Sequence, residues 1–359
     1  MISDRELKHK VVFRVDTNKH VGLGHIKRCW ALAAQFQQDG HQVLLAGAID
    51  ESFPNQFRDS HVPYQCLEAR THSPEDLSNF LAVCRRFDAE MIVMDVYGMD
   101  QEYGRRVMEE GYFLIAMHDT GMPTQAAHMI INGNLNAQMI PYHTSAEVTL
   151  LLGIDYLMMS PEYGNLQALK GQGQDSGTVK NILITMGGVD QYDLTTRILC
   201  ILNDIPADFT ITVIAGPYYE NQETIVQQIK RMKKPVDLVL SPPSLFLYIK
   251  NCSLAISSAG QTLYQLAALG RSTIGIALEE NQIGHLKELS KRGALIDLIY
   301  QEGKVFEEDL KNRISEMITD SSQRIRLAES AAKLVDGQGA HRAFKAIVHT
   351  YRSRREKHV

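Results

Sequence analysis

The feature that most constrains the fold of this chain is a regular alternation of short apolar runs with longer helical stretches. The short runs are rich in Val, Ile and Leu and show no polar alternation, which is typical of parallel strands covered by helices on both faces. Residues 28–38, 74–87 and 262–270 have the composition of crossover helices. The expected strands are 11–16, 42–48, 91–96, 113–119, 129–132 and 149–153 in the first half, and 181–187, 209–216, 236–240, 253–258, 272–278 and 294–298 in the second.

The same order of elements occurs twice, and a segment of different composition separates the two series. Residues 164–180 are rich in Gly, Gln and Ser and poor in apolar side chains, as flexible linkers are. A chain of 359 residues is also too long for one ordinary core. We therefore expect an α/β protein with two Rossmann-like domains, 1–163 and 181–339, that are joined by the linker 164–180 and face a central cleft. A terminal helix is expected over 340–359.

Composition and charge argue against several classes of protein. A net charge of -5 disfavours a nucleic-acid partner. Five cysteines without a CxxC pair indicate free thiols in a reducing compartment. No histidines have the spacing of a metal site, so we expect neither a metal nor another cofactor. Because the N-terminal segment is polar and no run approaches the roughly 20 apolar residues of a membrane span, we expect a cytoplasmic protein without membrane insertion.

The strongest local signal follows the first expected strand, in the sequence FRVDTNKHVGLGHIKRC (13–29). The strand ends at Asp16, a loop carries Gly22 and Gly24, and His25 begins a helix. Glycines let the backbone approach a ligand closely, and a helix start offers unpaired N–H groups. A histidine there could act as a general base, with its other ring nitrogen held by Asp16 or by a backbone carbonyl. The alternative is a loop glycine pair followed by a capping histidine.

Polar side chains also end other expected strands of the first half. Asp95 and Tyr97 lie at the end of the third strand, Asp119 ends the fourth, and Asn132 and Asn134 lie at the end of the fifth. Ligands of doubly wound sheets bind at the carboxyl ends of the strands, so each of these side chains could contact a substrate. The alternatives are helix capping by the carboxylates and turn formation by the asparagines.

Three clusters in the second half place small or polar residues directly after a strand, as phosphate sites do. Backbone N–H groups that glycine and serine leave accessible suit a diphosphate, and Asp190 is expected to cap the helix that follows the first cluster. The alternative is close packing of strand against helix. The residues are Gly187 and Gly188 at the end of the first strand, Ser257, Ser258 and Gly260 at the end of the fourth, and Asn281 and Gln282 after the fifth.

In this order, the motifs resemble the PseG/SpsG family, whose best-known members are UDP-sugar hydrolases of pseudaminic-acid biosynthesis and which is related in fold to GT-B glycosyltransferases. The resemblance covers about residues 11–345. The GxGHxxR element at 22–28 and the SSAG…ALG element at 257–270 are together specific. Further matching segments are MDVYG (94–98), IINGN (130–134), LLGIDYLMMSPEY (151–163), MGGVD (186–190), ENQ (280–282) and DGQGAHR (336–342).

The resemblance implies a GT-B-like enzyme that hydrolyses a UDP-linked 2,4-diacetamido-2,4,6-trideoxyhexose at its anomeric carbon and releases the free sugar and UDP. His25 matches the family's proposed general base, no metal takes part, and the terminal helix crosses back onto the first domain. The residues expected to bind the sugar are Asp16, Gly22, Gly24, Arg28, Asp95, Tyr97, Asn132 and Asn134, and those expected to bind the nucleotide are Gly187, Gly188, Ser257, Ser258, Gly260, Gln265, Asn281 and Gln282.

Two departures from the family pattern favour a catalytically silent protein more than a standard member would, and the same base chemistry would also serve a transferase. Gln265 stands where a glutamate would hold the nucleotide ribose, and the stretch Met158–Ser160 lacks the family's arginine. An amide loses the charge-assisted hydrogen bonds that a carboxylate makes to two hydroxyls. The alternatives are a GT-B-type glycosyltransferase that passes the sugar to a hydroxyl or an amine, and a catalytically silent nucleotide-sugar-binding protein.

Overall fold

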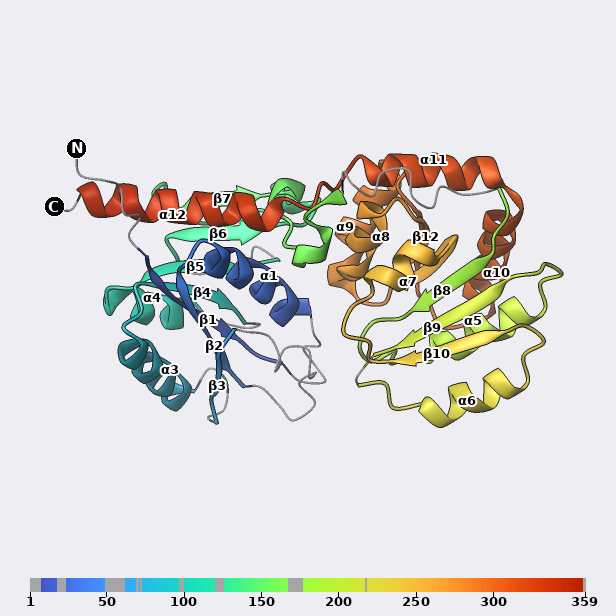
Figure 1. The fold of residues 1–359 in the computed structure, drawn as a ribbon, viewed down its shortest axis with the longest axis horizontal. Coiled ribbons are helices and arrows are strands. Elements are labelled where there is room, and N and C mark those ends of the chain that lie inside the picture. The colour runs from blue at the N-terminus through green and yellow to red at the C-terminus, as the bar shows by residue number, and fades with distance from the viewer. Residues whose placement is uncertain are drawn as a thin grey trace. The chain divides into compact units, whose positions relative to one another are not determined.

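The computed structural model folds into two compact α/β units, each built on one parallel β-sheet (Figure 1). The first unit contains Met1–Pro161 and Gln338–Val359, so the end of the chain returns to it, and the second contains Glu162–Gly337. The structure describes residues 8–17, 24–48, 62–68, 71, 73–96, 100–119, 126–166, 177–216 and 218–357.

The sheet of the first unit has seven parallel strands. They are β1 (Lys10–Val15), β2 (Gln42–Gly47), β3 (Tyr64–Cys66), β4 (Met91–Asp95), β5 (Phe113–Met117), β6 (Met129–Asn132) and β7 (Thr149–Leu152). Their order across the sheet is β3-β2-β1-β4-β5-β6-β7. β4 and β5 are buried over their whole length, which is why their sequences are apolar throughout. β1 pairs with β2 on one side and with β4 on the other, so that Val15 lies opposite Asp95.

Helices cover both faces of this sheet. They are α1 (Gly24–Gln38), α3 (Pro74–Phe87), α4 (Gln101–Glu109) and α12 (Gly339–Lys357), with the 3-10 turns η1 (Ala137–Met139) and η2 (Ile154–Tyr156). α1 and α12 lie side by side on one face (Figure 1), where the rings of Phe36 and Phe344 meet edge to face with centroids 5.0 Å apart. α3 and α4 cover the other face, and Ser73 and Asp100 cap their first turns.

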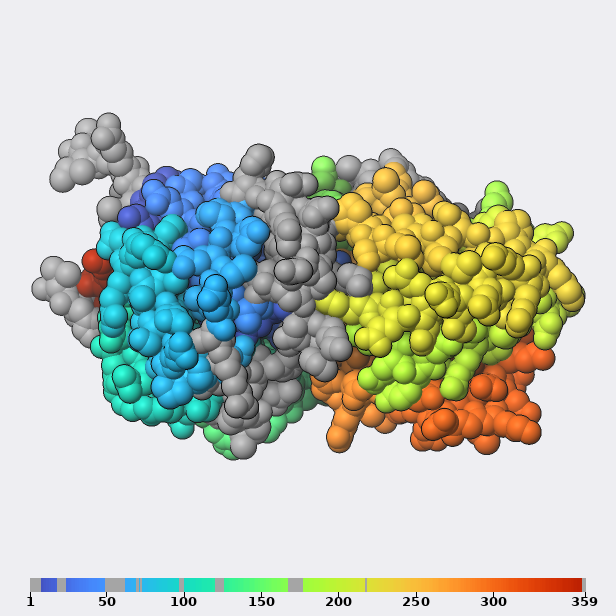
Figure 2. Space-filling view, turned by 90° about the horizontal axis from the view of Figure 1, so that it is seen from below, coloured from blue at the N-terminus to red at the C-terminus, as the bar shows by residue number. Residues whose placement is uncertain are grey.

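The sheet of the second unit has six parallel strands. They are β8 (Asn181–Thr185), β9 (Thr210–Ala215), β10 (Val236–Leu240), β11 (Leu254–Ser258), β12 (Ser272–Ala277) and β13 (Ile296–Ile299). Their order, β10-β9-β8-β11-β12-β13, repeats that of the first six strands of the other unit. The helices are α5 (Leu194–Asn203), α6 (Gln222–Lys230), α7 (Phe246–Asn251), α8 (Thr262–Ala268), α9 (Glu280–Lys291), α10 (Lys304–Thr319) and α11 (Ser321–Ala332), preceded by the 3-10 turn η3 (Pro161–Tyr163). The yellow segment of Figure 2, which contains α6 and the edge strand β10, lies on the side turned toward the viewer.

The two parallel sheets confirm the two Rossmann-like domains expected from the sequence. All twelve expected strands are present, although the last begins at Ile296 and not at residue 294. The strand that sequence analysis missed is β3, because its three residues are half exposed and form no apolar run. Across the described residues, no helix combines the length and apolar character that crossing a membrane requires.

Candidate active site

The candidate active site of the first unit lies where the order of strands in the sheet reverses. The chain runs outward from β1 to β2 and β3 and then returns to β4 on the other side of β1. The connections after β1 and β4 therefore leave the sheet in opposite directions, and open α/β sheets bind ligands at such a point. His25, in the first turn of α1, and Asp95, the last residue of β4, meet there.

His25 and Asp95 form a buried pair. Nδ1 of His25 lies 2.5 Å from Oδ1 of Asp95, and their side chains are 8% and 1% exposed. When the Nδ1–H group donates to the carboxylate, a neutral imidazole has its lone pair on Nε2, the nitrogen that can then accept a proton. The pair therefore has the arrangement that a general base requires.

Arg28 lies one turn after His25 on α1 and binds the same carboxylate. Its Nε and Nη2 atoms each lie 2.5 Å from an oxygen of Asp95, and its Nη1 lies 2.9 and 2.7 Å from the two oxygens of Asp119. Burial opposes ionisation of Asp95, but the adjacent Arg28 and His25 outweigh burial and hold the pKa of Asp95 well below its usual range. Asp95 is therefore an anion at neutral pH.

The acceptor that orients His25 is Asp95 and not Asp16, as the sequence had suggested. Asp16 is buried on the β2 side of β1, where its carboxylate accepts hydrogen bonds from Arg14 and from the backbone N–H of Ala48, the latter at 2.7 Å. Asp95 lies on the opposite side of β1, because β4 pairs there. Asp16 thus ties the ends of β1 and β2 together.

Two asparagines at the end of β6 extend the polar network around Asp119, which follows β5. The side-chain amide of Asn132 donates to the backbone carbonyl of Asp119 at 3.2 Å and to the hydroxyl of Tyr142 at 2.7 Å. The amide of Asn134 donates to the Asp119 carboxylate at 3.1 Å. Asp119 therefore links Arg28 to the end of β6. Sequence analysis missed Tyr142, because it lies in an irregular segment with no motif.

The glycines of the first motif and Tyr97 were also expected to contact the sugar. Gly24 is the first residue of α1, and a Cβ added there would meet no described atom within 4 Å, so packing does not require a glycine at this position. Gly22 and Tyr97 lie outside the described residues.

The side chains of the described residues provide no metal site. No group of three or more His, Cys, Asp or Glu side chains among them could hold a metal ion. The cysteine nearest to the His25–Asp95 pair is Cys29, whose Sγ lies 3.6 Å from an oxygen of Asp95. Burial, together with the charge of Asp95, raises the pKa of this thiol well above its ordinary value, so it is neutral.

The second unit has the equivalent reversal of strand order between β8 and β11, and small residues occupy it. Gly187 follows β8 with a φ of 81°, a conformation that favours glycine. A Cβ added to Gly187 would lie 3.3 Å from Oγ of Ser258, the last residue of β11, and a Cβ on Gly216 would lie 2.5 Å from Cα of Gly188. The connections after β8 and β9 and the end of β11 are therefore packed closely, without room for a side chain at Gly216 and with little at Gly187.

Asp190 closes the loop after β8, as expected from the sequence. Its carboxylate accepts hydrogen bonds from the backbone N–H groups of Leu194 and Thr195, both at 2.9 Å, at the start of α5. Burial raises the pKa of Asp190 in spite of these hydrogen bonds. Asp190 and Asp193 both have a positive φ, of 48° and 50°, so the loop is held in a conformation that costs free energy.

The two serines that end β11 have different surroundings. The Ser257 hydroxyl is fully buried and donates to the backbone carbonyl of Ser258 at 3.0 Å, so this side chain is used within the protein. Ser258 faces Gly187 across the strand-order reversal. A Cβ on Gly260 would meet no described atom within 4 Å, which leaves open space beside its backbone.

The three remaining candidates lie on α8 and α9. Gln265 is half-buried on α8. Gln282 accepts a hydrogen bond through Oε1 from the backbone N–H of Leu278 at 2.9 Å, so it fixes the start of α9. Asn281 is exposed and borders a hollow of about 430 Å³ with Glu279. The structure therefore brings Gly187, Gly188 and Ser258 together and gives Gln282 a capping role.

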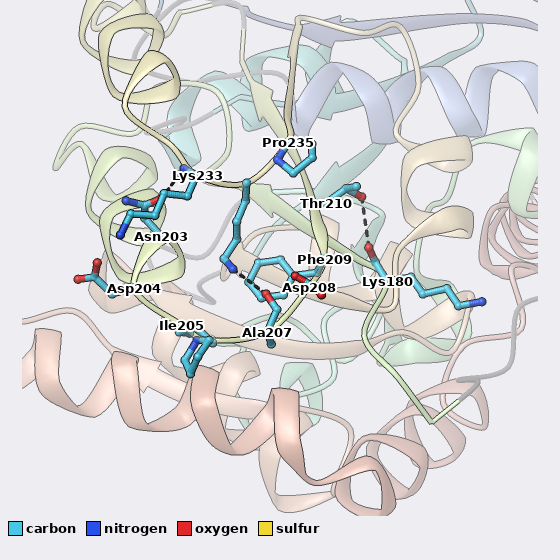
Figure 3. A pocket seen from close by; sticks show the side chains of 12 residues that line it. Lys180, Asn203, Asp204, Ile205, Ala207, Asp208, Phe209, Thr210, Lys233 and Pro235 are labelled. Carbon is cyan, nitrogen blue, oxygen red and sulfur yellow. Dashed lines mark hydrogen bonds between the residues drawn. The ribbon is translucent and has the colours of Figure 1, made fainter.

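The larger hollow, shown in Figure 3, lies at the amino ends of the strands of the second sheet. Its volume is about 870 Å³, and its lining includes Lys180 before β8, Phe209 before β9 and Pro235 before β10. Ligands of open α/β sheets bind at the carboxyl ends of the strands. This hollow is at the amino ends, so it is not part of the candidate site.

Comparisons with known proteins agree with the motifs and the fold. Residues 181–348 match the glycosyltransferase family 28 C-terminal domain. Over 266 residues the chain is 23% identical to the spore coat polysaccharide biosynthesis protein SpsG of Bacillus subtilis, covering 73% of this chain and 77% of that protein. Over 295 residues it is 22% identical to the UDP-2,4-diacetamido-2,4,6-trideoxy-beta-L-altropyranose hydrolase of Campylobacter jejuni, covering 81% of this chain and 100% of that protein. These relatives support the likeness to the PseG/SpsG family that the motifs indicate.

Similarity to other proteins extends beyond these two relatives. The PseG/SpsG-like chain is 21% identical over 294 residues to the uncharacterized protein MJ1062 of Methanocaldococcus jannaschii, which covers 79% of this chain but only 59% of that protein. Among solved structures it resembles MurG of Acinetobacter baumannii, with a TM-score of 0.68 and 15% identity over 96% of this chain and 100% of that chain. It also resembles Anabaena HepE in complex with UDP-glucose, with a TM-score of 0.62 and 14% identity over 95% and 100%. The fold is therefore GT-B-like.

Proposed function

We propose that this PseG/SpsG-like chain is a nucleotide-sugar hydrolase that releases a free acetamido deoxysugar and UDP. The observation that carries the proposal is the buried His25–Asp95 pair at the strand-order reversal of the first sheet. The relatives support the substrate class, because the Campylobacter protein is named as the hydrolase of a UDP-linked diacetamido sugar and the HepE structure contains UDP-glucose.

In the proposed reaction, water attacks the anomeric carbon of the sugar. Nε2 of His25 takes a proton from the water as the water oxygen bonds to that carbon. The bond from the carbon to the diphosphate oxygen breaks, and its electron pair leaves with UDP. Asp95 accepts the hydrogen bond from Nδ1–H and stabilises the imidazolium, which then returns its proton to solvent. A nucleoside diphosphate is already a good leaving group, so the two carboxylates of a glycosidase are not needed.

The second unit supplies the proposed site for the diphosphate of UDP. Gly187, Gly188 and Ser258 present backbone and a hydroxyl at the reversal point, and glycine lets an anion approach the backbone closely. The carboxylate of Asp190 is already engaged by the N–H groups that begin α5. At the equivalent point of the first unit, by contrast, the anionic Asp95 would repel a diphosphate.

A glycosyltransferase is the second candidate, and the fold favours it. The chain resembles MurG in structure and contains a segment that matches a glycosyltransferase domain. His25 would then take its proton from an acceptor hydroxyl or amine in place of water. A silent binding protein is the third candidate, and Gln265 in place of the expected glutamate favours it.

One experiment separates these candidates. The purified chain is incubated with a UDP-linked 2,4-diacetamido-2,4,6-trideoxyhexose in water enriched in heavy oxygen, with the His25→Asn variant as control. We expect release of UDP without any acceptor and the heavy oxygen in the hydroxyl of the free sugar. Heavy oxygen in the phosphate of UDP would place the attack at phosphorus and refute the role of His25. Release of UDP only after an acceptor is added would establish the transferase, and binding without turnover would establish the silent protein.

A further inference from the structure

Arg28 makes several hydrogen bonds to other side chains of the protein. Three of its nitrogens contact two carboxylates, those of Asp95 and Asp119, and its side chain is only 12% exposed. Burial opposes the charge of the guanidinium, but Asp119 and Asp95 outweigh burial and hold the pKa of Arg28 well above its ordinary value. Arg28 is therefore a fixed cation between two anions.

We propose that Arg28 is a positioning residue: it holds Asp95 in place and offsets its charge, so that Asp95 can orient His25 without favouring the imidazolium. This inference rests on the proposed function of His25 as the general base. The sequence suggested another role for Arg28, direct contact with the sugar. The two roles predict different changes when the arginine is replaced.

The charges around His25 explain why an orienting carboxylate needs a cation beside it. A bare carboxylate next to an imidazole favours the imidazolium, which cannot accept a proton. Arg28 offsets Asp95 through two hydrogen bonds and still leaves Oδ1 within 2.5 Å of Nδ1 of His25. Its Nη2 also lies 3.2 Å from that Nδ1, so the positive charge acts on the ring directly as well. Asp119, on the far side of the guanidinium, adds a negative charge and acts in the opposite sense. Cys29, which also contacts Asp95, is a neutral thiol because burial raises its pKa well above the ordinary value.

The contacts of Arg28 with Asp95 and Asp119 require a guanidinium. Nε and Nη2 bind Asp95 side-on while Nη1 binds both oxygens of Asp119. A lysine has one compact charge and no planar fork, so it cannot make both sets of contacts. Arg28→Lys is therefore expected to restore the charge near Asp95 only in part.

The test is the pH profile of kcat/KM for UDP release from the UDP-linked diacetamido sugar. In Arg28→Met, the midpoint of the acid limb should move to a pH that is higher by about 1 unit or more. The rate of this variant should partly recover at alkaline pH. Asp119→Asn removes the opposing charge and should move the limb downward. Arg105→Met, which removes an exposed arginine from α4, is the matched control and should leave the limb in place.

Nuclear magnetic resonance of the His25 ring measures the same effect without turnover. The ring signals, assigned with His25→Asn, should titrate at higher pH in Arg28→Met and at lower pH in Asp119→Asn. If these shifts appear and no UDP-sugar is hydrolysed, the charge relation stands and the proposed function fails. A raised KM with an unmoved limb would make Arg28 a sugar ligand, and an equal loss at every pH with an unmoved titration would make it structural; either result overturns the inference.

The Arg28→Met protein leaves a buried carboxylate without its cation, so this variant can fail to fold. In that case Arg28→Lys and Asp119→Asn decide the question. Opposite movements of the His25 titration in these two variants, upward and downward in that order, support the inference. Movement in the same direction, or none, overturns it.

Discussion

The two units share a strand order, yet the point where that order reverses is filled in opposite ways. In the first unit it holds a charged cluster of His25, Asp95 and Arg28. In the second it holds Gly187 and Ser258, packed so closely that a single added methyl group would touch its neighbour. The same topology thus offers the same kind of ligand site twice, and the residues decide the chemistry at each.

The difference separates two tasks that a nucleotide-sugar enzyme must perform. Titratable side chains can exchange protons with a substrate, whereas closely packed glycine backbone can hold an anion without a competing charge. Replacement of a side chain in the first unit should therefore change the rate. Addition of a side chain in the second should change nucleotide binding.

The largest expected effect is on the rate, in His25→Asn. Loss of the general base should lower kcat by about 10²–10⁴-fold, the range typical of a lost proton acceptor. UDP binding should be nearly unchanged, since the nucleotide is assigned to the second unit. Turnover is measured as UDP release, and binding by titration calorimetry. An equal loss of rate and of UDP affinity would break the contrast between the units.

Two glycine-to-alanine substitutions in the second unit separate the role of a glycine in packing from its role in nucleotide binding. Gly187→Ala must adopt a φ of 81° and approach Ser258, so it should lose roughly 1–3 kcal/mol of unfolding free energy as well as UDP affinity. Gly260→Ala meets no described atom within 4 Å, so its unfolding free energy should be retained. If the diphosphate lies beside Gly260, the Kd for UDP should still rise about tenfold in that variant, a cost of about 1.4 kcal/mol.

Urea unfolding and titration calorimetry check both glycine variants. The informative result is the pair of measurements on Gly260→Ala. Unchanged stability with weaker UDP binding would place the anion there. Unchanged stability with unchanged UDP binding would remove Gly260 from the nucleotide site.

Acid should destabilise the first unit before the second. Burial lowers the pKa of His128 to about 4 and also lowers the pKa of His41, both in the first unit. The unfolded chain has histidines near 6.5, so it binds more protons than the folded unit between these values. The contribution of these two histidines to the unfolding free energy is therefore fully present above about pH 6.5, and it decreases as the pH falls toward 4. The second unit has a single histidine, His285.

Hydrogen exchange at pH 7 and pH 5 measures this difference unit by unit. Amides of β5 and β6 should lose protection at pH 5, and those of β11 should not. The variant His128→Gln should show a weaker pH dependence, because its amide oxygen can still accept the hydrogen bond from the backbone N–H of Leu114 without binding a proton. Equal loss of protection in both units would contradict the prediction.

The smallest expected effect is on nucleotide affinity, in Gln265→Glu. A carboxylate that binds two ribose hydroxyls should tighten UDP binding by about 1 kcal/mol relative to the amide. The gain should shrink with 2′-deoxy-UDP, which lacks one of the hydroxyls. Weaker binding of UDP by the variant would mean that Gln265 has a different partner.

Much of the fold could be predicted from the sequence, because the signals that carry it are local. Apolar runs without alternation mark β4 and β5, and they are buried along their whole length. The glycine pair at 187–188 marks a sharp loop for the same local reason, since Gly187 needs a positive φ. β3 escaped detection because three half-exposed residues carry too little pattern.

Many residues of the candidate site could be predicted from the sequence, but the contacts between them could not. His25 and Asp95 were each predicted to lie at a strand or helix end, yet 70 residues separate them in the sequence. The expected partner of His25 was Asp16, which is closer in the sequence, or a backbone carbonyl. Asp119 lies 91 residues from Arg28, and nothing local links the two. The return of α12 to the first unit was likewise expected from the family resemblance, not from the residues themselves.

The sequence by itself determined where the strands and helices are, that the chain forms two Rossmann-like domains, and which residue types lie at the ends of their strands. Only the tertiary structure decided that Asp95 orients His25, that Arg28 is clamped between Asp95 and Asp119, and that Asp16 ties β1 to β2. The physical reason is that periodicity and turn preferences act between near neighbours in the chain. Contact between strand ends depends on which strand lies beside β1, and here β4 lies on one side and β2 on the other.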